Sequence, residues 1–443
     1  MDKPLPLNEW LSDARRSDRI VAFDGDKNWT QAMLVHDVQQ LYSELSSCTG
    51  ERWALCFDNS YWFIVALLAT LHAGKTPLLP GHCREAQLRE QQSLFSGVLT
   101  DLPLGLNCPV INPQTISSHL PQTLPPVAHD AGVILFTSGS TGEPAQIFKS
   151  VNALNEESVW LAKLWGSDLK ECRVVASVSH QHMYGLTFRI MLPMTQGLAC
   201  AVSMIHFPEQ LAAHTSYPLL FISSPAFLKR LDTSLAAPPC RKTISAAGLL
   251  DDETAQRAKQ WFGEAVCEIY GTTETGVLAW RQHHSVAPPW QPFPEVKFIA
   301  REEGWSVRSP LTDTSVCPLD DNLAFTPQGG FRLLGRRDRI VKIEEKRISL
   351  SEIERRLLAL PGVQEAAVVP IVRAGRMTLG AIVVPDGAAT LPAKYKTQWR
   401  QTLRQWLEPV AIPRYWRIVE RIPLNSQSKR AWKQLQELFD ETH

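Results

Sequence analysis

Short β-rich runs alternate with helix-length segments from about residue 53 to residue 275, and this alternation restricts the fold more than any other feature. Between several runs, apolar residues recur at helical spacing, as in residues 155–166 and 224–235. Such alternation is typical of parallel sheets, because parallel neighbouring strands need crossover connections. We therefore predict a large α/β domain with mostly parallel sheets and flanking helices, whose ligands bind beyond the carboxyl ends of the strands. The predicted strands are residues 52–58, 97–102, 132–139, 173–179, 219–223, 242–248 and 266–273.

The sequence changes character near residue 336, where the charged cluster GRRDRIVKIEEKR begins a second region. Ser349 followed by Glu352 predicts a capping box at the start of a helix, which Pro361 and Gly362 end. Two strands, a helix at residues 394–407, a strand at residues 415–420 and a last helix follow. A chain of 443 residues also exceeds what one hydrophobic core usually supports. We predict a large domain at residues 1–337 and a small α+β domain at residues 338–443.

The overall composition narrows the classes of function. Lys plus Arg and Asp plus Glu both number 45, so the chain offers no charge excess for binding nucleic acid. The nine cysteines include no CxxC pair, which argues against a disulfide framework and favours a reducing, cytoplasmic compartment. The polar N-terminus lacks the apolar core of a signal peptide. The apolar run at residues 61–71 is about half the length of a membrane span, so we expect no membrane span and interpret it as a buried helix.

The segment FTSGSTGEP, residues 136–144, begins within a predicted strand and runs beyond its end. Glycines let the chain turn tightly around an anion, and the backbone N–H groups and hydroxyls here are donors for a phosphate. A solvent-exposed turn rich in serine and glycine is the alternative interpretation of this segment taken alone.

A second polar segment, EIYGTTETG at residues 268–276, ends another predicted strand. The ring of Tyr270 can stack on a base, and the threonine hydroxyls can meet a phosphate or a carboxylate. The carboxylate of Glu274 can hold Mg²⁺ beside polyphosphate oxygens. Alone, this segment could be a hairpin turn. Together, the two segments predict a nucleotide site.

A third segment, ATLHAGKT at residues 69–76, differs by one residue from the Walker A pattern, which has glycine in place of Ala69. It follows a helix-like run instead of a strand, and Pro77 and Pro80 exclude the helix that should come next. An ATPase built on this segment is therefore the weakest of the nucleotide-binding interpretations.

Four segments resemble, in order and spacing, the motifs of the adenylate-forming superfamily: FTSGSTGEP, YGTTETG, GRRDRIVKIEEKRISLSEIE and PLNSQSKR. That superfamily includes acyl-CoA synthetases, carrier-protein ligases and peptide-synthetase adenylation domains, and the flanking residues here look most similar to acyl- or aryl-carrier-protein ligases. The resemblance implies an enzyme that uses ATP and Mg²⁺ to convert a fatty or aryl carboxylic acid to an acyl adenylate, with release of pyrophosphate. The acyl group then passes to the phosphopantetheine thiol of CoA or of an acyl carrier protein, the expected partner.

The resemblance also implies nucleotide contacts for the residues that match its motifs. The loop residues Thr137, Ser138, Gly139, Ser140, Thr141 and Gly142 would surround the β- and γ-phosphates. The other contacts would come from Gly248 in an adenine wall at residues 244–250, Tyr270 on the adenine with Gly271 and Thr272 beside it, Thr273 at the α-phosphate, Glu274 on Mg²⁺, Asp321 at the ribose and Arg336 near it.

Four further residues are interpreted through the same resemblance. His182 would flank the acyl carboxylate, whereas His180 is interpreted as structural, because two histidines without a third ligand do not predict a metal site. Lys429 would contact the α-phosphate and the carboxylate during adenylation. Asp338 would be the hinge about which the small domain rotates between the two reactions.

Three positions differ from the family pattern. Ala145 stands where a lysine usually follows the loop proline, so Lys149 is predicted to reach the phosphates instead. Glu345 and Ser428 each stand where glycine is usual, and in thioester-forming relatives the first of these glycines borders the pantetheine channel. These differences leave two alternatives open: a nucleotide-binding module without turnover, and an acyl-adenylate ligase with a non-thiol acceptor.

Overall fold

The computed structural model of the chain divides into two compact units. The first unit comprises residues 1–297 and 308–317, and the second comprises residues 298–307 and 318–443. The boundary after residue 317 precedes the predicted boundary after residue 337, because the strands between residues 318 and 336 pack within the second unit. The structure describes residues 4–116, 122–138, 144–302, 304–312, 314–336, 339–343, 346–373, 376–386, 395–407, 409–424 and 430–440.

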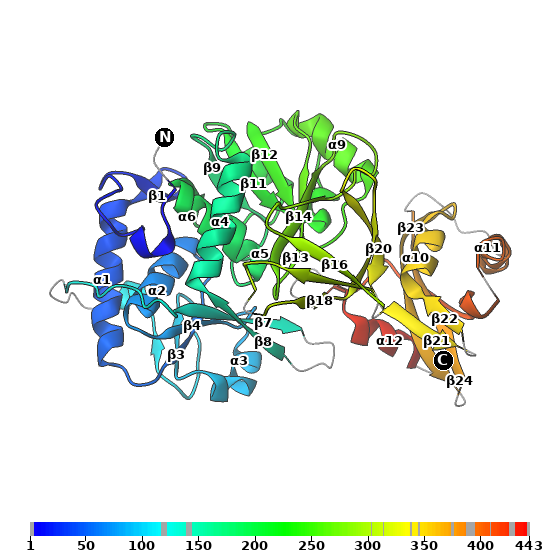
Figure 1. Cartoon of the computed structure of the whole chain (residues 1–443), viewed down its shortest axis with the longest axis horizontal. Coiled ribbons are helices and arrows are strands. Elements are labelled where there is room, and N and C mark those ends of the chain that lie inside the picture. The colour runs from blue at the N-terminus through cyan, green and yellow to red at the C-terminus, as the bar shows by residue number, and fades with distance from the viewer. Residues whose placement is uncertain are drawn as a thin grey trace. The chain divides into compact units, whose positions relative to one another are not determined.

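A nine-stranded sheet with a parallel centre dominates the first unit (Figure 1). Strands β13, β12, β11, β9, β10 and β1 are parallel neighbours, and antiparallel strands extend the sheet at both edges. The order is β15-β14-β13-β12-β11-β9-β10-β1-β2, with bounds β1 Ile20–Asp24, β2 Lys27–Thr30, β9 Arg173–Ala176, β10 Ala199–Ala201, β11 Leu219–Ser223, β12 Cys240–Ser245, β13 Cys267–Thr272, β14 Gly276–Gln282 and β15 Gln291–Pro292.

A six-stranded sheet forms the second layer of this unit, with a parallel body and one antiparallel edge strand. The edge hairpin β7–β8 flanks residues 139–143. The two sheets confirm the prediction of an α/β fold with mostly parallel strands. The order is β6-β5-β3-β4-β7-β8, with bounds β3 Arg52–Cys56, β4 Thr76–Leu79, β5 Gly97–Thr100, β6 Val110–Ile111, β7 Gly132–Ser138 and β8 Pro144–Ser150.

Helix α2 (Ser60–His72) packs on β3 and β4 of one sheet and on β1 and β10 of the other. The side chain of Asn59 begins the helix by accepting hydrogen bonds from the backbone N–H groups of Tyr61 and Trp62. Almost every residue of α2 is buried, which explains its uniform apolarity and confirms the predicted buried helix. Within the described part of the chain, no helix has the length and apolarity to cross a bilayer.

The remaining helices of the first unit connect and cover the two sheets, and Figure 1 shows α1 beside α2. Short helical turns of other types lie between them. The bounds are α1 Gln31–Ser47, α3 Glu85–Glu90, α4 Val151–Trp165, α5 Met183–Gly185, α6 Leu192–Gln196, α7 Pro208–Ala212, α8 Pro225–Leu228, α9 Asp252–Phe262, the 3₁₀ helices η1 Leu7–Glu9, η2 Gln92–Leu94 and η3 Pro113–Thr115, and the π-helix η4 Leu186–Met191.

The second unit has a sheet, β23-β24-β25, whose two faces are covered by different helices. Alternate residues of β23 face alternate sides, so Val368 packs with α10 and α11 while Val369 packs with α12. The Ser349 hydroxyl accepts a hydrogen bond from the backbone N–H of Glu352, as the predicted helix cap requires. The bounds are β16 Lys297–Arg301, β17 Gly304–Arg308, β18 Cys317–Leu319, β19 Asp321–Phe325, β20 Phe331–Arg336, β21 Ile340–Ile343, β22 Lys346–Ser349, α10 Leu350–Leu358, β23 Val363–Arg373, β24 Arg376–Pro385, α11 Tyr395–Leu403, η6 Pro409–Ala411, β25 Tyr415–Ile418 and α12 Trp432–Asp440.

Candidate active site

Four neighbouring parallel strands, β9, β11, β12 and β13, bring several predicted site residues to one edge of the nine-stranded sheet. His182 follows β9, Gly248 follows β12, and residues 270–272 end β13. The carboxyl ends of parallel strands meet at the same edge, which is where α/β proteins bind their ligands. The structure therefore gathers residues that are about ninety positions apart in the sequence.

Tyr184 links three of these strand ends. It lies on α5, and its hydroxyl is 2.9 Å from the carbonyl oxygen of Ser223 at the end of β11 and 2.9 Å from that of Ile244 in β12. Burial raises the pKa of Tyr184 well above its ordinary value, so the hydroxyl keeps its proton and donates it to these carbonyls. Tyr184 thus holds the segment after His182 against the adjacent strands.

The turn between β13 and β14 carries two of the predicted catalytic residues. The backbone N–H of Thr272 donates to the hydroxyl of Thr275 at 3.1 Å, and the N–H of Thr275 donates to the hydroxyl of Thr272 at 3.2 Å. The Thr272 hydroxyl is therefore already hydrogen-bonded within the turn. Thr273 is half-buried and Glu274 is exposed, so these are the side chains that the turn leaves accessible.

Tyr270 lies at the end of β13 with 8% of its surface exposed. Its ring centroid is 5.8 Å from that of Trp290, with the ring planes inclined at 54°. The guanidinium of Arg281 lies 4.5 Å from the Trp290 ring centroid, a cation–π distance. Aromatic packing therefore fixes the orientation of Tyr270, whose stacking on adenine remains a prediction.

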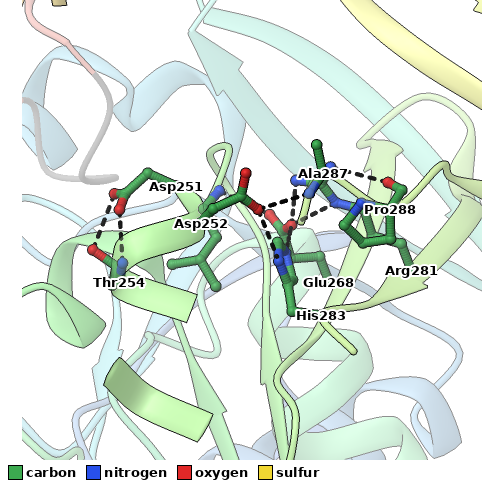
Figure 2. A network of polar contacts seen from close by, with 9 residues as sticks. Asp251, Asp252, Thr254, Glu268, Arg281, His283, Ala287 and Pro288 are labelled. Carbon is green, nitrogen blue, oxygen red and sulfur yellow. Dashed lines mark hydrogen bonds and ion pairs between the residues drawn. The ribbon is translucent and has the colours of Figure 1, made fainter. Parts of the chain in front are cut away.

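Glu268, two residues before Tyr270, is fully buried at the centre of a polar network (Figure 2). Its Oε2 atom accepts from Arg281 Nε at 2.6 Å and lies 2.6 Å from His283 Nε2. Its Oε1 atom accepts from the backbone N–H of Leu250 at 2.9 Å. Because Leu250 ends the predicted adenine wall, one buried carboxylate connects that wall to β13 and β14.

The network continues from His283 to α9, as Figure 2 shows. His283 Nδ1 lies 3.6 Å from Asp252 Oδ1, and the same oxygen accepts from the backbone N–H of Ala287 at 2.9 Å. Asp251 caps α9 by accepting from the backbone N–H of Thr254. Glu268 is thus fixed by Leu250, Arg281 and His283, and the last of these connects it to α9.

His180 and His182 occupy different environments. His180 is buried, its Nε2 atom is 2.9 Å from the carbonyl oxygen of Phe57, and its ring centroid is 4.3 Å from that of Phe63. A carbonyl oxygen only accepts, so His180 Nε2 carries the proton and donates it. This geometry supports the structural interpretation of His180. His182 is half-buried directly before α5, and its contact with the acyl carboxylate remains a prediction.

Burial lowers the pKa of His180 well below its ordinary value of 6.5. The unfolded chain binds a proton at this residue below pH 6.5 while the folded chain does not, so stability is present above that pH and is lost as the pH falls. Between pH 7.5 and 5.5 we expect this residue to lower the free energy of unfolding by at most about 1.4 kcal/mol, the limit reached if the folded residue stays unprotonated throughout. Urea unfolding at the two pH values tests this, with His180→Phe as the variant and the exposed His206→Phe as the matched control. An unchanged pH dependence in His180→Phe contradicts the prediction.

Lys149 is buried and bonded to the backbone of two other segments. It is 3% exposed, and its Nζ atom donates to the carbonyl oxygens of Glu274 at 2.7 Å and Leu311 at 3.0 Å. That Lys149 reaches the phosphates in place of the lysine missing at Ala145 remains a prediction. Its ammonium contacts the backbone of the turn that carries Glu274.

Some predicted site residues lie outside the described residues or are described only in part. Asp321 is half-buried on β19 in the second unit, where it pairs with Arg336 of β20 in the strand register. For Thr137, Ser138 and Arg336 the structure describes the backbone, which lies on strands β7 and β20. The residues outside the described part are Gly139, Ser140, Thr141, Gly142, Asp338, Glu345, Ser428 and Lys429.

Two buried acids of this region are absent from the predicted site, Glu157 on α4 and Glu268 on β13. Glu268 stands between apolar residues, where a carboxylate is rarely buried without partners, so it was a detectable signal for a buried polar network. Glu157 follows Asn155 and Glu156 and gave no such signal. Their partners, however, come from distant positions that the sequence does not indicate.

The comparison with known proteins identifies the family. The sequence model described as AMP-binding enzyme matches residues 84–316, and the model described as the AMP-binding enzyme C-terminal domain matches residues 352–429. The chain belongs to the AMP-binding enzyme family. This confirms the predicted membership of the adenylate-forming superfamily.

Individual relatives agree with that assignment. The chain is 29% identical to a 4-coumarate–CoA ligase of Halorhodospira halophila over 311 residues, which cover 68% of this chain and 75% of that ligase. ATP-bound MatB from Rhodopseudomonas palustris has a similar fold, with a TM-score of 0.82 and 20% identity over 98% of this chain and 99% of that chain. The o-succinylbenzoate CoA synthetase MenE from Bacillus subtilis, solved with its acyl-adenylate intermediate, gives a TM-score of 0.81 and 18% identity over 97% of this chain and 98% of that chain. Both structures support the predicted adenylate-forming architecture.

Proposed function

We propose that this AMP-binding enzyme activates a fatty or aryl carboxylic acid with ATP, forming an acyl adenylate and releasing pyrophosphate. The acyl group then passes to the phosphopantetheine thiol of CoA or of an acyl carrier protein. The observation that carries the proposal is the placement of His182, Gly248 and the turn with Glu274 at one sheet edge. The similarity to a 4-coumarate–CoA ligase supports an aryl acid and a thiol acceptor.

The accessible residues fit magnesium-bound ATP. Mg²⁺ usually takes one or two protein carboxylates and obtains its other ligands from phosphates and water. Glu274 offers one exposed carboxylate, and among the described residues no cluster of three metal-ligating side chains offers an alternative cage. Glu274 would therefore hold the ion that neutralises the triphosphate, with Thr273 at the α-phosphate and the loop at residues 137–142 around the β- and γ-phosphates.

The chemistry needs mainly positioning. A carboxylate oxygen of the acid attacks the α-phosphorus of ATP and pyrophosphate leaves, which makes the acyl carbon electrophilic. The thiol sulfur then attacks that carbon, and AMP leaves with the electron pair of the broken bond. Because little covalent work falls to the protein, orientation and charge neutralisation by residues such as Lys429 supply most of the rate enhancement. A hinge at Asp338 would let one site stage both reactions.

The proposed cytoplasmic location is supported by the cysteines. All nine are free thiols in the structure, with Cys56, Cys172, Cys200, Cys240 and Cys267 buried. Free thiols are typical of a reducing compartment, which supports a cytoplasmic location for this enzyme.

Exchange of labelled pyrophosphate into ATP tests the first half-reaction. We expect exchange that depends on the added acid, highest for the aryl or medium-chain acid that the enzyme activates, because adenylate formation is reversible. Absence of exchange across a broad panel of aryl and aliphatic acids would contradict the proposal. Supplying CoA and a phosphopantetheinylated carrier protein separately then identifies the acceptor, and transfer to neither supports a non-thiol acceptor.

A nucleotide-binding module without turnover is the second candidate. Ala145 stands where the family usually has a loop lysine, and the ammonium of Lys149 already donates to the carbonyl oxygens of Glu274 and Leu311. Calorimetry for ATP binding, combined with an assay of pyrophosphate release, distinguishes the two candidates, because a module of this kind would bind ATP without releasing pyrophosphate when acids are added.

A further inference from the structure

We infer that Lys149 and Glu157 form a buried clamp that positions the Glu274 turn for magnesium–ATP. The inference rests on the proposed function, and it assigns both residues a role that acts through the backbone of the Glu274 turn. Lys149 comes from β8, directly after the phosphate loop, and Glu157 comes from α4.

Lys149 holds one side of the turn. It pairs with Val133 in the β7–β8 hairpin, and its ammonium donates to the Glu274 carbonyl oxygen at 2.7 Å. A second hydrogen bond, to the Leu311 carbonyl oxygen at 3.0 Å, orients the same ammonium from another segment of the first unit. Charge-assisted hydrogen bonds of this kind are among the strongest in proteins, particularly where water is excluded. The backbone of Glu274 is therefore fixed from the six-stranded sheet.

Glu157 holds the other side. It is 2% exposed, and its Oε1 atom accepts from the backbone N–H of Val277 at 2.8 Å. Its Oε2 atom accepts from the Thr187 hydroxyl at 2.7 Å, on the π-helix that follows His182 and α5. A Cβ atom at Gly276 would lie only 2.7 Å from Oε1, so glycine at this position lets the carboxylate approach the chain.

The two residues carry opposite charges on the two sides of the same turn. Burial raises the pKa of Glu157, while its hydrogen bonds with Thr187 and Val277 and the charge of Lys149 oppose that rise and favour the ionised carboxylate. Removing the charge of one residue alone would leave the other charge buried without that compensation, which is costly. The pair therefore ties three regions together: the strand after the phosphate loop, the π-helix after His182, and both sides of the turn that presents Glu274.

The test measures ATP binding by calorimetry with and without Mg²⁺, together with urea unfolding. In wild type, Mg²⁺ should increase the affinity for ATP by a measurable factor, called here the Mg²⁺ effect. Lys149→Met is expected to reduce this factor about tenfold to a hundredfold, as is typical when the support of a metal ligand is removed. The double variant Lys149→Met/Glu157→Gln removes both charges and keeps an amide that can bond Thr187 and Val277. We expect it to recover much of the lost urea midpoint while keeping the weakened Mg²⁺ effect, because the Glu274 carbonyl still lacks its donor.

Thr187→Val is the matched control, since it removes a buried hydrogen bond to Glu157 and leaves both bonds of Lys149 intact. It should lower the urea midpoint and retain the wild-type Mg²⁺ effect. A wild-type Mg²⁺ effect in the double variant overturns the inference and leaves the proposed function standing. If Lys149→Met does not fold, the double variant alone decides. A wild-type protein that binds no ATP refutes the proposed function itself, so the two failures are distinguishable.

Discussion

Replacing Glu268 by leucine is expected to lower the free energy of unfolding by about 3–5 kcal/mol, the range typical of breaking a buried ion pair from one side. Glu268 is fully buried, and its loss leaves Arg281 and His283 without their shared acceptor at 2.6 Å. The backbone N–H of Leu250 loses its partner as well. Urea unfolding followed by tryptophan fluorescence measures the change, because Trp290 lies beside Arg281.

The matched control for Glu268→Leu is Glu264→Gln, which removes an exposed charge close to the start of β13. Exposed substitutions of this kind usually change stability by no more than about 0.5 kcal/mol. Glu268→Leu should also weaken ATP binding, since Leu250 and Tyr270 both depend on this network for their positions. Equal unfolding midpoints for Glu268→Leu and wild type would show that the Glu268 network contributes nothing to the free energy of unfolding.

Replacing Lys429 by alanine is expected to reduce acid-dependent pyrophosphate exchange by about 10²- to 10³-fold, as removal of one catalytic donor does elsewhere. The physical reason is that the family resemblance implies contact between this lysine and the charge that develops at the α-phosphate and carboxylate. Thioester formation from supplied acyl adenylate should remain close to the wild-type rate, because that step needs no attack at phosphorus. Both half-reactions are followed with the same purified protein.

Lys433→Ala provides the control for Lys429→Ala, since Lys433 is an exposed cation on α12. We expect wild-type rates in both half-reactions for this control. An equal loss in the two half-reactions of Lys429→Ala would contradict the role assigned to it. Unchanged exchange in Lys429→Ala would contradict it as well.

The fold was largely predictable because its elements depend on local patterns. The run at residues 219–223 became β11 with the predicted bounds, and the apolar run at residues 61–71 became α2, buried between two sheets. A helix between two successive strands can serve as the crossover connection that parallel strands need. Alternation of strands with helices therefore leaves few topologies other than parallel sheets. The domain boundary was less predictable, because residues 298–307 and 318–336 pack with the second unit through long-range contacts.

The site, like the fold, was predictable only in part. The glycines and hydroxyls of residues 136–144 and 268–276 predict a nucleotide site by their chemistry, and the family match agrees with that prediction. Lys149 shows what the sequence could not indicate. It is close to the phosphate loop in the chain, and only the fold brings its ammonium to the carbonyl oxygens of Glu274 and Leu311, which are more than 120 positions away.

The sequence alone therefore determined the strand and helix order, the family motifs and the residue types available for chemistry, since periodicity and motif spacing are local properties of the chain. Only the tertiary structure decided which buried charges meet. Glu157 meets Thr187 and the backbone of Val277, and Glu268 meets Arg281 and His283, because a buried charge is stable only where the packed fold supplies partners at hydrogen-bonding distance.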